Sequence, residues 1–284
     1  MGAVKRIAED VIADVWTQSG GVLSALNLDH RWLTGKCSDW STRMTRDQDA
    51  FADCNPLLGR LLSDRVLHDG AFGASLVELY RYTTALGQLG ARALRRLRND
   101  LASDDPAKFQ NALAEMAVHQ CIASIGAPIT FVRSGGKPTP DYEITIGGKG
   151  IRAELKSITS PEVRLRGSGA VELFSASLDE LTAKLIAEHY EAPFVKRQLS
   201  RREPGLVFVD VSMCDYARVA VVVNERIGPG TLRDNLHAPL SALCRADDPG
   251  QFARTPLWLV FLDTILAHVA LVVPVEVPAN WTTA

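Results

Sequence analysis

Apolar and polar residues alternate with two different periods along this chain, and the change falls near residue 105. Before that point, apolar residues recur every three or four positions, the spacing of one face of a helix. This stripe predicts two helices. The first ends at Gly20-Gly21, and the second is a long helix from Ser75 to Leu101. Residues 22–75 show no clear period and are expected to form short helices and loops. The first helix rests on Val4, Ile7, Ala8, Val11, Ile12 and Val15, and the long helix on Leu79, Leu86, Leu89, Ala93 and Leu97.

Beyond residue 105, helical stripes alternate with short apolar runs that are typical of strands. A helix is predicted over Ala107 to Ile125, because Gly126 and Pro128 follow it. Further helices are expected from about Ser177 and over Thr231 to Cys244, while Val219 to Val223 fits either a strand or a buried helix. Strands are predicted over residues 129–132, in a hairpin over 140–156, over 205–212, and twice within 256–275.

The polar stretch Ser103-Asp104-Asp105-Pro106 is the clearest boundary in the chain. We expect an α-helical N-terminal region over residues 1–105, with a role in recognition or assembly. Residues 106–284 should then form a mixed α/β domain in which helices flank a central sheet. The fold class predicted for the chain is therefore α/β with a helical N-terminal region.

The most apolar span is Pro256 to Val275, which Asp263 and His268 interrupt. Two buried strands fit this pattern better than one membrane helix, which needs about 20 apolar residues in a row. The N-terminus becomes amphipathic within a few residues, so no signal peptide is expected. No association with a membrane is predicted.

Composition describes a globular protein that can bury a core, with 284 residues and a formal net charge of −2. A nucleic-acid-binding protein of this charge would need its positive residues concentrated locally. The five cysteines are odd in number and show no C-x-x-C spacing, which favours reduced thiols and a cytoplasmic location. The cysteines are Cys37, Cys54, Cys121, Cys214 and Cys244.

The hairpin over residues 140–156 carries the main chemical signal. Its two strands alternate apolar and polar residues around Gly147-Gly148-Lys149-Gly150, which supplies turn chemistry. With a period of two, Glu154 and Lys156 share one face of the second strand. The hairpin brings Asp141, near the start of the first strand, towards Glu154 near the end of the second. Two carboxylates and a lysine are therefore expected to converge.

Such a convergence has a chemical use, because two close carboxylates that are both ionised usually bind a hard cation such as Mg²⁺. A bound metal polarises a phosphoryl oxygen and lowers the pKa of a coordinated water. A lysine beside it can orient that water or stabilise charge on the phosphate. The alternative is an ordinary hairpin in which Glu154 and Lys156 form a solvated pair.

Pro140-Asp141 and Glu154-Leu155-Lys156 resemble the motif of the PD-(D/E)xK nuclease superfamily. The resemblance covers about residues 107–212 and implies a restriction-endonuclease-like fold that hydrolyses phosphodiester bonds, most often in DNA. It implies Mg²⁺ as the cofactor, with Mn²⁺ able to substitute. The metal would be held by Asp141, Glu154 and the Leu155 carbonyl, with Glu115 joining from the upstream helix. Lys156 would be catalytic together with Asp141, Glu154 and Glu115.

Two basic clusters are available for phosphates. The first follows the helix expected from Ser177, and its residues are predicted to bind nucleic acid; in the family, a lysine or glutamine of this region faces the metal or phosphate. The second lies at the end of the long N-terminal helix. In both, a solvated helix end is the alternative. The first cluster is Lys184, Lys196, Arg197, Gln198 and Arg201, and the second is Arg92, Arg95, Arg96 and Arg98.

A metal-dependent nuclease acting on DNA is therefore the predicted function, with restriction, repair, defence and a toxin role all open. One alternative is a non-catalytic nucleic-acid-binding module that keeps a nuclease-like fold. Another is an interaction protein in which the hairpin pattern is accidental. The helical N-terminal region could support a homo-oligomer or contact a partner protein.

Overall fold

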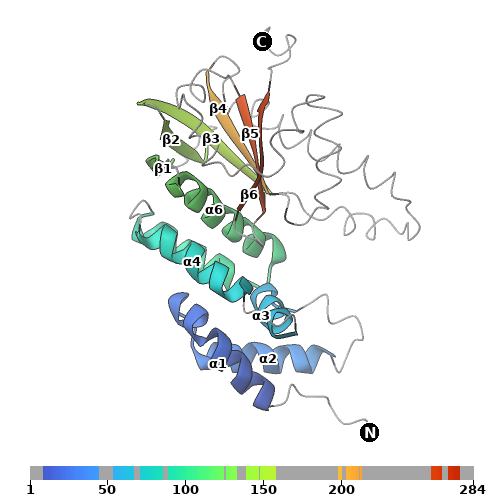
Figure 1. Ribbon diagram of the computed structural model, residues 1–284. Helices are drawn as coiled ribbons and strands as arrows, with labels where there is room; N and C mark the ends of the chain where they lie inside the picture. Colours follow the sequence, from blue (N-terminus) through green and yellow to red (C-terminus); the bar gives the residue numbers. More distant parts are fainter. Residues whose placement is uncertain are drawn as a thin grey trace, which may run out of the picture. The chain divides into compact units, whose positions relative to one another are not determined.

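The computed structural model describes two compact units, Met1–Met116 and Ala117–Ala284 (Figure 1). The residues that it describes are 9–44, 54–66, 71–85, 89–124, 126–132, 139–146, 148–157, 198–199, 203–210, 212, 257–263 and 268–275. The helices expected from Ser177 and over Thr231 to Cys244, and the segment Val219 to Val223, lie outside these residues.

The first unit is helical, as predicted. Leucines from five of its helices form the core, and they include Leu23, Leu33, Leu57, Leu79 and Leu97, each at most 1% exposed. The helices are α1 (Glu9–Ala25), α2 (His30–Met44), α3 (Pro56–Val66), α4 (Ala71–Ala85), α5 (Ala91–Leu101) and the first part of α6 (Pro106–Ser124).

The predicted end of the first helix at Gly20-Gly21 is wrong, because α1 continues to Ala25. The buried stripe of the helix runs on through Val22 and Leu23, so continued burial outweighs the cost of about 1 kcal/mol for each helical glycine. Its end is set instead by Asn27, which has a φ of 59°. The Leu28 N–H donates to the Leu23 carbonyl and the Asn27 N–H to the Ser24 carbonyl, the pattern of a Schellman cap.

One long helix over Ser75 to Leu101 is also wrong. Helix α4 ends at Ala85, and α5 begins at Ala91 after Gly90, whose φ of −60° and ψ of 158° are extended. Gly87 and Gly90 both fall inside the predicted helix and weaken it where the break occurs. The apolar stripe was real on each side, but it belongs to two helices.

Asn55 joins the start of α3 to the loop between α5 and α6. Its Oδ1 accepts a hydrogen bond of 3.0 Å from the Leu58 N–H, which makes it the N-cap of α3. Its Nδ2 donates to the carbonyls of Ala102 and Ser103, both at 3.1 Å, and to Asp104. The carboxylate of Asp104 also pairs with Lys36 at 2.7 Å. This partly buried network fixes the predicted boundary segment to the helical core.

Cys37, Cys54 and Cys121 are free thiols, as the spacing of the cysteines predicted. Burial raises the pKa of both Cys37 and Cys54 to about 11. These two thiols therefore remain protonated, and poorly nucleophilic, at neutral pH.

The second unit holds a six-stranded mixed sheet in the order β1-β2-β3-β4-β5-β6. Strands β3 and β4 are parallel, as are β4 and β5, and the other neighbouring pairs are antiparallel. The predicted strands are confirmed, including two C-terminal strands in place of a membrane helix. They are β1 (Ile129–Phe131), β2 (Tyr142–Ile146), β3 (Lys149–Ser157), β4 (Gly205–Asp210), β5 (Leu257–Asp263) and β6 (His268–Val275).

One face of the sheet packs on the second part of α6. Tyr142, Ile144 and Ile146 alternate with exposed residues along β2 and join a core cluster with Val118 and Ile122 of α6. Strand β4 is buried along its whole length, which explains its unbroken apolar run. The helix predicted over Ala107 to Ile125 is thus confirmed, together with the mixed α/β class. Among the described residues, no helix is long and apolar enough to cross a membrane.

Candidate active site

The turn of the β2–β3 hairpin fixes which residues face each other. Ile146 pairs with Lys149, and Gly148 adopts a φ of 76°, which favours glycine at this position of a tight hairpin turn. Counting back along the ladder, Tyr142 pairs with Ala153. One further step places Asp141 opposite Glu154, on the face of the sheet that turns away from α6. Cross-strand neighbours of this kind have Cβ atoms about 5 Å apart.

Glu154 is a fully buried carboxylate, with 0% of its side chain exposed. Its Oε2 accepts a hydrogen bond of 2.8 Å from Nζ of Lys156, two residues further along β3. Its Oε1 is buried and has no hydrogen-bond partner among the described residues. A buried carboxylate oxygen without a donor is costly, and such atoms in native structures call for a functional or structural explanation.

Asp141 completes the group from the segment that leads into β2. Its Oδ2 accepts a hydrogen bond of 2.9 Å from the Leu155 N–H, which anchors the carboxylate across the hairpin. Burial, and then repulsion from Asp141, raise the pKa of Glu154 to about 7, although Lys156 acts to lower it. The two carboxylates therefore sense each other directly. The predicted convergence of Asp141, Glu154 and Lys156 is observed.

The residues present fit a divalent cation of the hard, oxygen-binding kind. Asp141 and Glu154 offer carboxylate oxygens on one face, and Oε1 of Glu154 lacks any other partner among the described residues. No group of three or more His, Cys, Asp or Glu residues gathers in the part of the chain that the structure describes. A cation here would thus complete its ligands with backbone carbonyls, such as that of Leu155, and with water, as Mg²⁺ commonly does.

Glu115 belongs to the helical unit, where its Oε2 lies 2.5 Å from Nη2 of Arg96. The side chain is largely buried, with 17% exposed. The charge of Arg96 therefore offsets at least part of the cost of burying this carboxylate. The role of Glu115 as a further metal ligand stays a prediction.

Gln198 is the one residue of the predicted nucleic-acid-binding set that the structure describes. Its Nε2 donates a hydrogen bond of 3.4 Å to the carbonyl of Thr139, two residues before Asp141. Its Oε1 is buried without a partner among the described residues. Gln198 thus lies beside the segment that carries Asp141. Lys184, Lys196, Arg197 and Arg201 lie outside the described residues.

Two buried polar residues near this end of the sheet were not predicted. Asp210, with 0% exposed, ends β4 opposite Ser157, and its Oδ1 accepts hydrogen bonds from the N–H and hydroxyl of Ser212. An acidic residue at the carboxyl end of an apolar parallel strand was the signal for it in the sequence.

His119 is the second such residue and lies on α6 with 1% of its surface exposed. Its ring packs edge-on against Tyr142 at 5.5 Å, and neither ring nitrogen has a hydrogen-bond partner among the described residues. Burial lowers the pKa of His119 to about 4, so the imidazole is neutral at pH 7. No local pattern signals this residue, because its burial depends on which side of α6 packs on the sheet.

Comparisons with models of protein families, with curated proteins and with solved structures found no match to this chain.

Proposed function

We propose that this protein is a Mg²⁺-dependent nuclease that hydrolyses phosphodiester bonds in DNA. The observation that carries the proposal is the group formed by Asp141, Glu154 and Lys156 on one face of the β2–β3 hairpin. Two facing carboxylates can hold a cation that activates water for phosphodiester hydrolysis, and an adjacent ammonium group can stabilise charge on the phosphate.

The order of elements supports a restriction-endonuclease-like core. Helix α6 is followed by the three antiparallel strands β1 to β3, and β4 then lies parallel to β3. A parallel neighbour needs a crossover connection, and residues 158–204 are long enough to provide one. This order resembles the helix, three strands, helix and strand expected of the PD-(D/E)xK superfamily.

Each residue of the group has a distinct chemical task in the proposal. Asp141 and Glu154 hold the cation, which when bound would polarise a phosphoryl oxygen and activate a water molecule. Lys156 uses one N–H on Glu154 and has others to offer to the phosphate, where negative charge grows in the transition state. The Leu155 N–H keeps the Asp141 carboxylate in place. The hairpin thus arranges these groups before substrate binds.

A cleavage assay on plasmid, linear duplex, single-stranded DNA and RNA tests the proposal. We expect cleavage of DNA with Mg²⁺ or Mn²⁺ and none with EDTA. Lack of cleavage of every substrate, together with DNA binding that does not depend on metal, would contradict the proposal and favour the non-catalytic binding module.

Calorimetric titration with Mn²⁺ separates the metal site from the reaction. Asp141→Ala and Glu154→Ala should each lose most of the binding seen for the wild type. Glu143→Gln is the matched control, because Glu143 is an exposed carboxylate of β2, two residues after Asp141 and therefore on the same face of the sheet. Equal Mn²⁺ affinity in all four proteins would place the metal elsewhere.

A further inference from the structure

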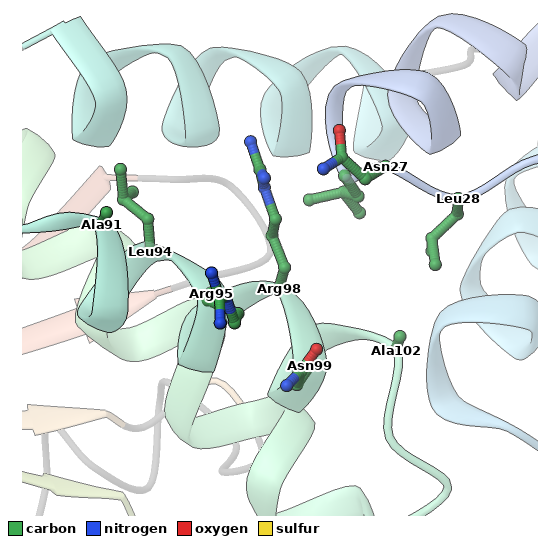
Figure 2. A pocket seen from close by; sticks show the side chains of 9 residues that line it. Asn27, Leu28, Ala91, Leu94, Arg95, Arg98, Asn99 and Ala102 are labelled. Atoms are coloured by element: carbon green, nitrogen blue, oxygen red, sulfur yellow. The ribbon is translucent and has the colours of Figure 1, made fainter.

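The helical unit contains a pocket of about 420 Å³ that none of the chemistry above uses (Figure 2). Its walls come from the loop that follows α1, and from one face of α5 with the residue that caps it. The volume falls within the range of about 300 to 1,000 Å³ that is usual for small-molecule sites. All of its lining residues belong to the first unit.

The polar side chains of this pocket carry positive charge without a compensating carboxylate. Arg95 and Arg98 line it together with Asn27 and Asn99, and no Asp or Glu is among the lining residues. Arg95 makes no ion pair or hydrogen bond with any residue that the structure describes. The neighbouring Arg96 differs, because Glu115 neutralises it. Two guanidinium charges therefore remain in the pocket.

Arg98 is held in position by a neutral partner. Its Nε donates a hydrogen bond to the hydroxyl of Tyr80, and its guanidinium carbon lies 5.3 Å from the centre of the Tyr80 ring. Tyr80 is itself 5% exposed, so the anchor is rigid. This contact preserves the charge of Arg98 and leaves its terminal N–H groups for a ligand. Figure 2 shows the side chain extended away from α5.

The opposite wall is fixed by the cap of α1. Asn27 occupies the left-handed position of the Schellman motif, so its backbone is held by the hydrogen bonds of that motif. Leu26 and Leu28 on either side of it, with Leu94 of α5, give the pocket an apolar wall. The guanidinium of Arg98, which Tyr80 holds in place, and the apolar surface of these leucines favour a ligand with an anionic group on a partly apolar body.

We propose that this pocket binds a phosphate ester, either of a free nucleotide or at the end of a nucleic-acid strand. Two guanidinium groups match the double charge and the several acceptor oxygens of a terminal phosphate. The apolar wall accommodates the attached sugar or base. The pocket shares no residue with the Asp141–Glu154 hairpin, so this assignment does not depend on the nuclease activity.

Calorimetric titration of the full chain in EDTA tests the assignment with three probes. They are AMP, a short DNA strand with a 5′ phosphate, and the same strand without it. Binding of AMP identifies a nucleotide site, and binding of only the phosphorylated strand identifies a strand-end site. The assignment would be overturned if the wild type bound neither AMP nor the phosphorylated strand. It would also be overturned if the two DNA strands bound equally and AMP did not bind.

Matched variants locate the binding. Arg95→Gln should weaken it about tenfold or more, since a hydrogen bond to a charged group contributes about 1.5–3 kcal/mol. Tyr80→Phe should weaken it less, by releasing Arg98. Arg92→Gln removes the same charge from an exposed position of α5 outside the pocket and should change affinity less than about twofold. Equal losses in Arg92→Gln and Arg95→Gln, with unchanged thermal unfolding, would contradict the assignment.

Discussion

In the helical unit, buried polar side chains such as Ser41, Asn55 and Thr83 donate hydrogen bonds to other groups of the unit. In the sheet unit, Glu154 and His119 each bury at least one atom that has no partner among the described residues. Both units bury polar groups, but among the described residues only those of the second unit are left incompletely satisfied.

The difference indicates where folding and function make different demands. A satisfied group such as Asn55 specifies how helices and loops join, and it offers nothing to a ligand. An unsatisfied group raises the free energy of the folded state, and it persists when a ligand or a mechanism uses it. The hairpin that holds Asp141 and Glu154 has this second character. The comparison predicts opposite responses to mutation in the two units.

A large effect is expected from Lys156→Met, smaller only than the effect of removing a metal-binding carboxylate. Removing one electrostatic contact to a developing charge typically lowers turnover by about 10² to 10³. DNA affinity should change little, because the effect belongs to the transition state. Single-turnover rates and binding constants would be measured beside Lys149→Met, an exposed lysine at the turn of the same hairpin. A large loss of affinity with an unchanged rate would make Lys156 a binding residue.

His119 should make the fold sensitive to acid. Its folded pKa of about 4 lies below its ordinary value of 6.5, so the unfolded chain binds the proton more readily between these values. The contribution of the neutral His119 to the free energy of unfolding is complete above pH 6.5. It is lost as the pH falls towards 4, which lowers that free energy by on the order of 3 kcal/mol.

Urea unfolding between pH 7 and 4 measures this change, with His119→Leu as the variant. The free energy of unfolding of the variant should depend less on pH in this window. An identical pH dependence in both proteins would show that other groups cause the acid sensitivity.

Glu154→Gln should stabilise the metal-free protein at alkaline pH while removing activity. The raised pKa, about 7 against an ordinary 4.5, means that the folded state favours the protonated carboxyl. The free energy of unfolding therefore falls as the pH rises through this range, by on the order of 3 kcal/mol, and the raised pKa already includes the opposing effect of Lys156. Unfolding at pH 5 and pH 8 in EDTA should show the variant gaining only at pH 8.

Asn55→Ala should destabilise the protein at every pH, by about 2 kcal/mol. It removes the N-cap of α3 and leaves the carbonyls of Ala102 and Ser103 without this donor. Asn55→Ser is the control, because its hydroxyl can still cap α3 while the amide donor to the two carbonyls is lost, and no charge is added beside Asp104. Thermal unfolding in which Asn55→Ala matched the wild type would show that the network contributes nothing to stability.

The hairpin was predictable because short-range rules determine it. The alternation of Tyr142, Ile144 and Ile146 fixed the face, and Gly148 marked the turn, so the position of Asp141 opposite Glu154 followed by counting. Strand β4 was equally clear from its unbroken apolar run. These features need no knowledge of distant contacts.

Other features depend on tertiary contacts that no local pattern contains. The stripe of α1 passes through Gly20-Gly21 because later residues of the helix are buried, and α4 and α5 separate where glycines interrupt a stripe that reads as continuous. The burial of His119 depends on which side of α6 packs on the sheet. The pocket beside Arg98 required the anchor from Tyr80, which lies 18 positions away in the sequence.

The most direct test of the central claim is single-turnover DNA cleavage, at saturating protein with Mg²⁺, by Asp141→Asn, Glu154→Gln and Glu143→Gln. The first two variants keep the shape of the side chain and remove only a charge that the cation needs. We expect both to lose more than the roughly 10² to 10³ assigned to Lys156, and Glu143→Gln to cleave like the wild type. Cleavage at the wild-type rate by Asp141→Asn and Glu154→Gln would contradict the assignment of the active site to this hairpin.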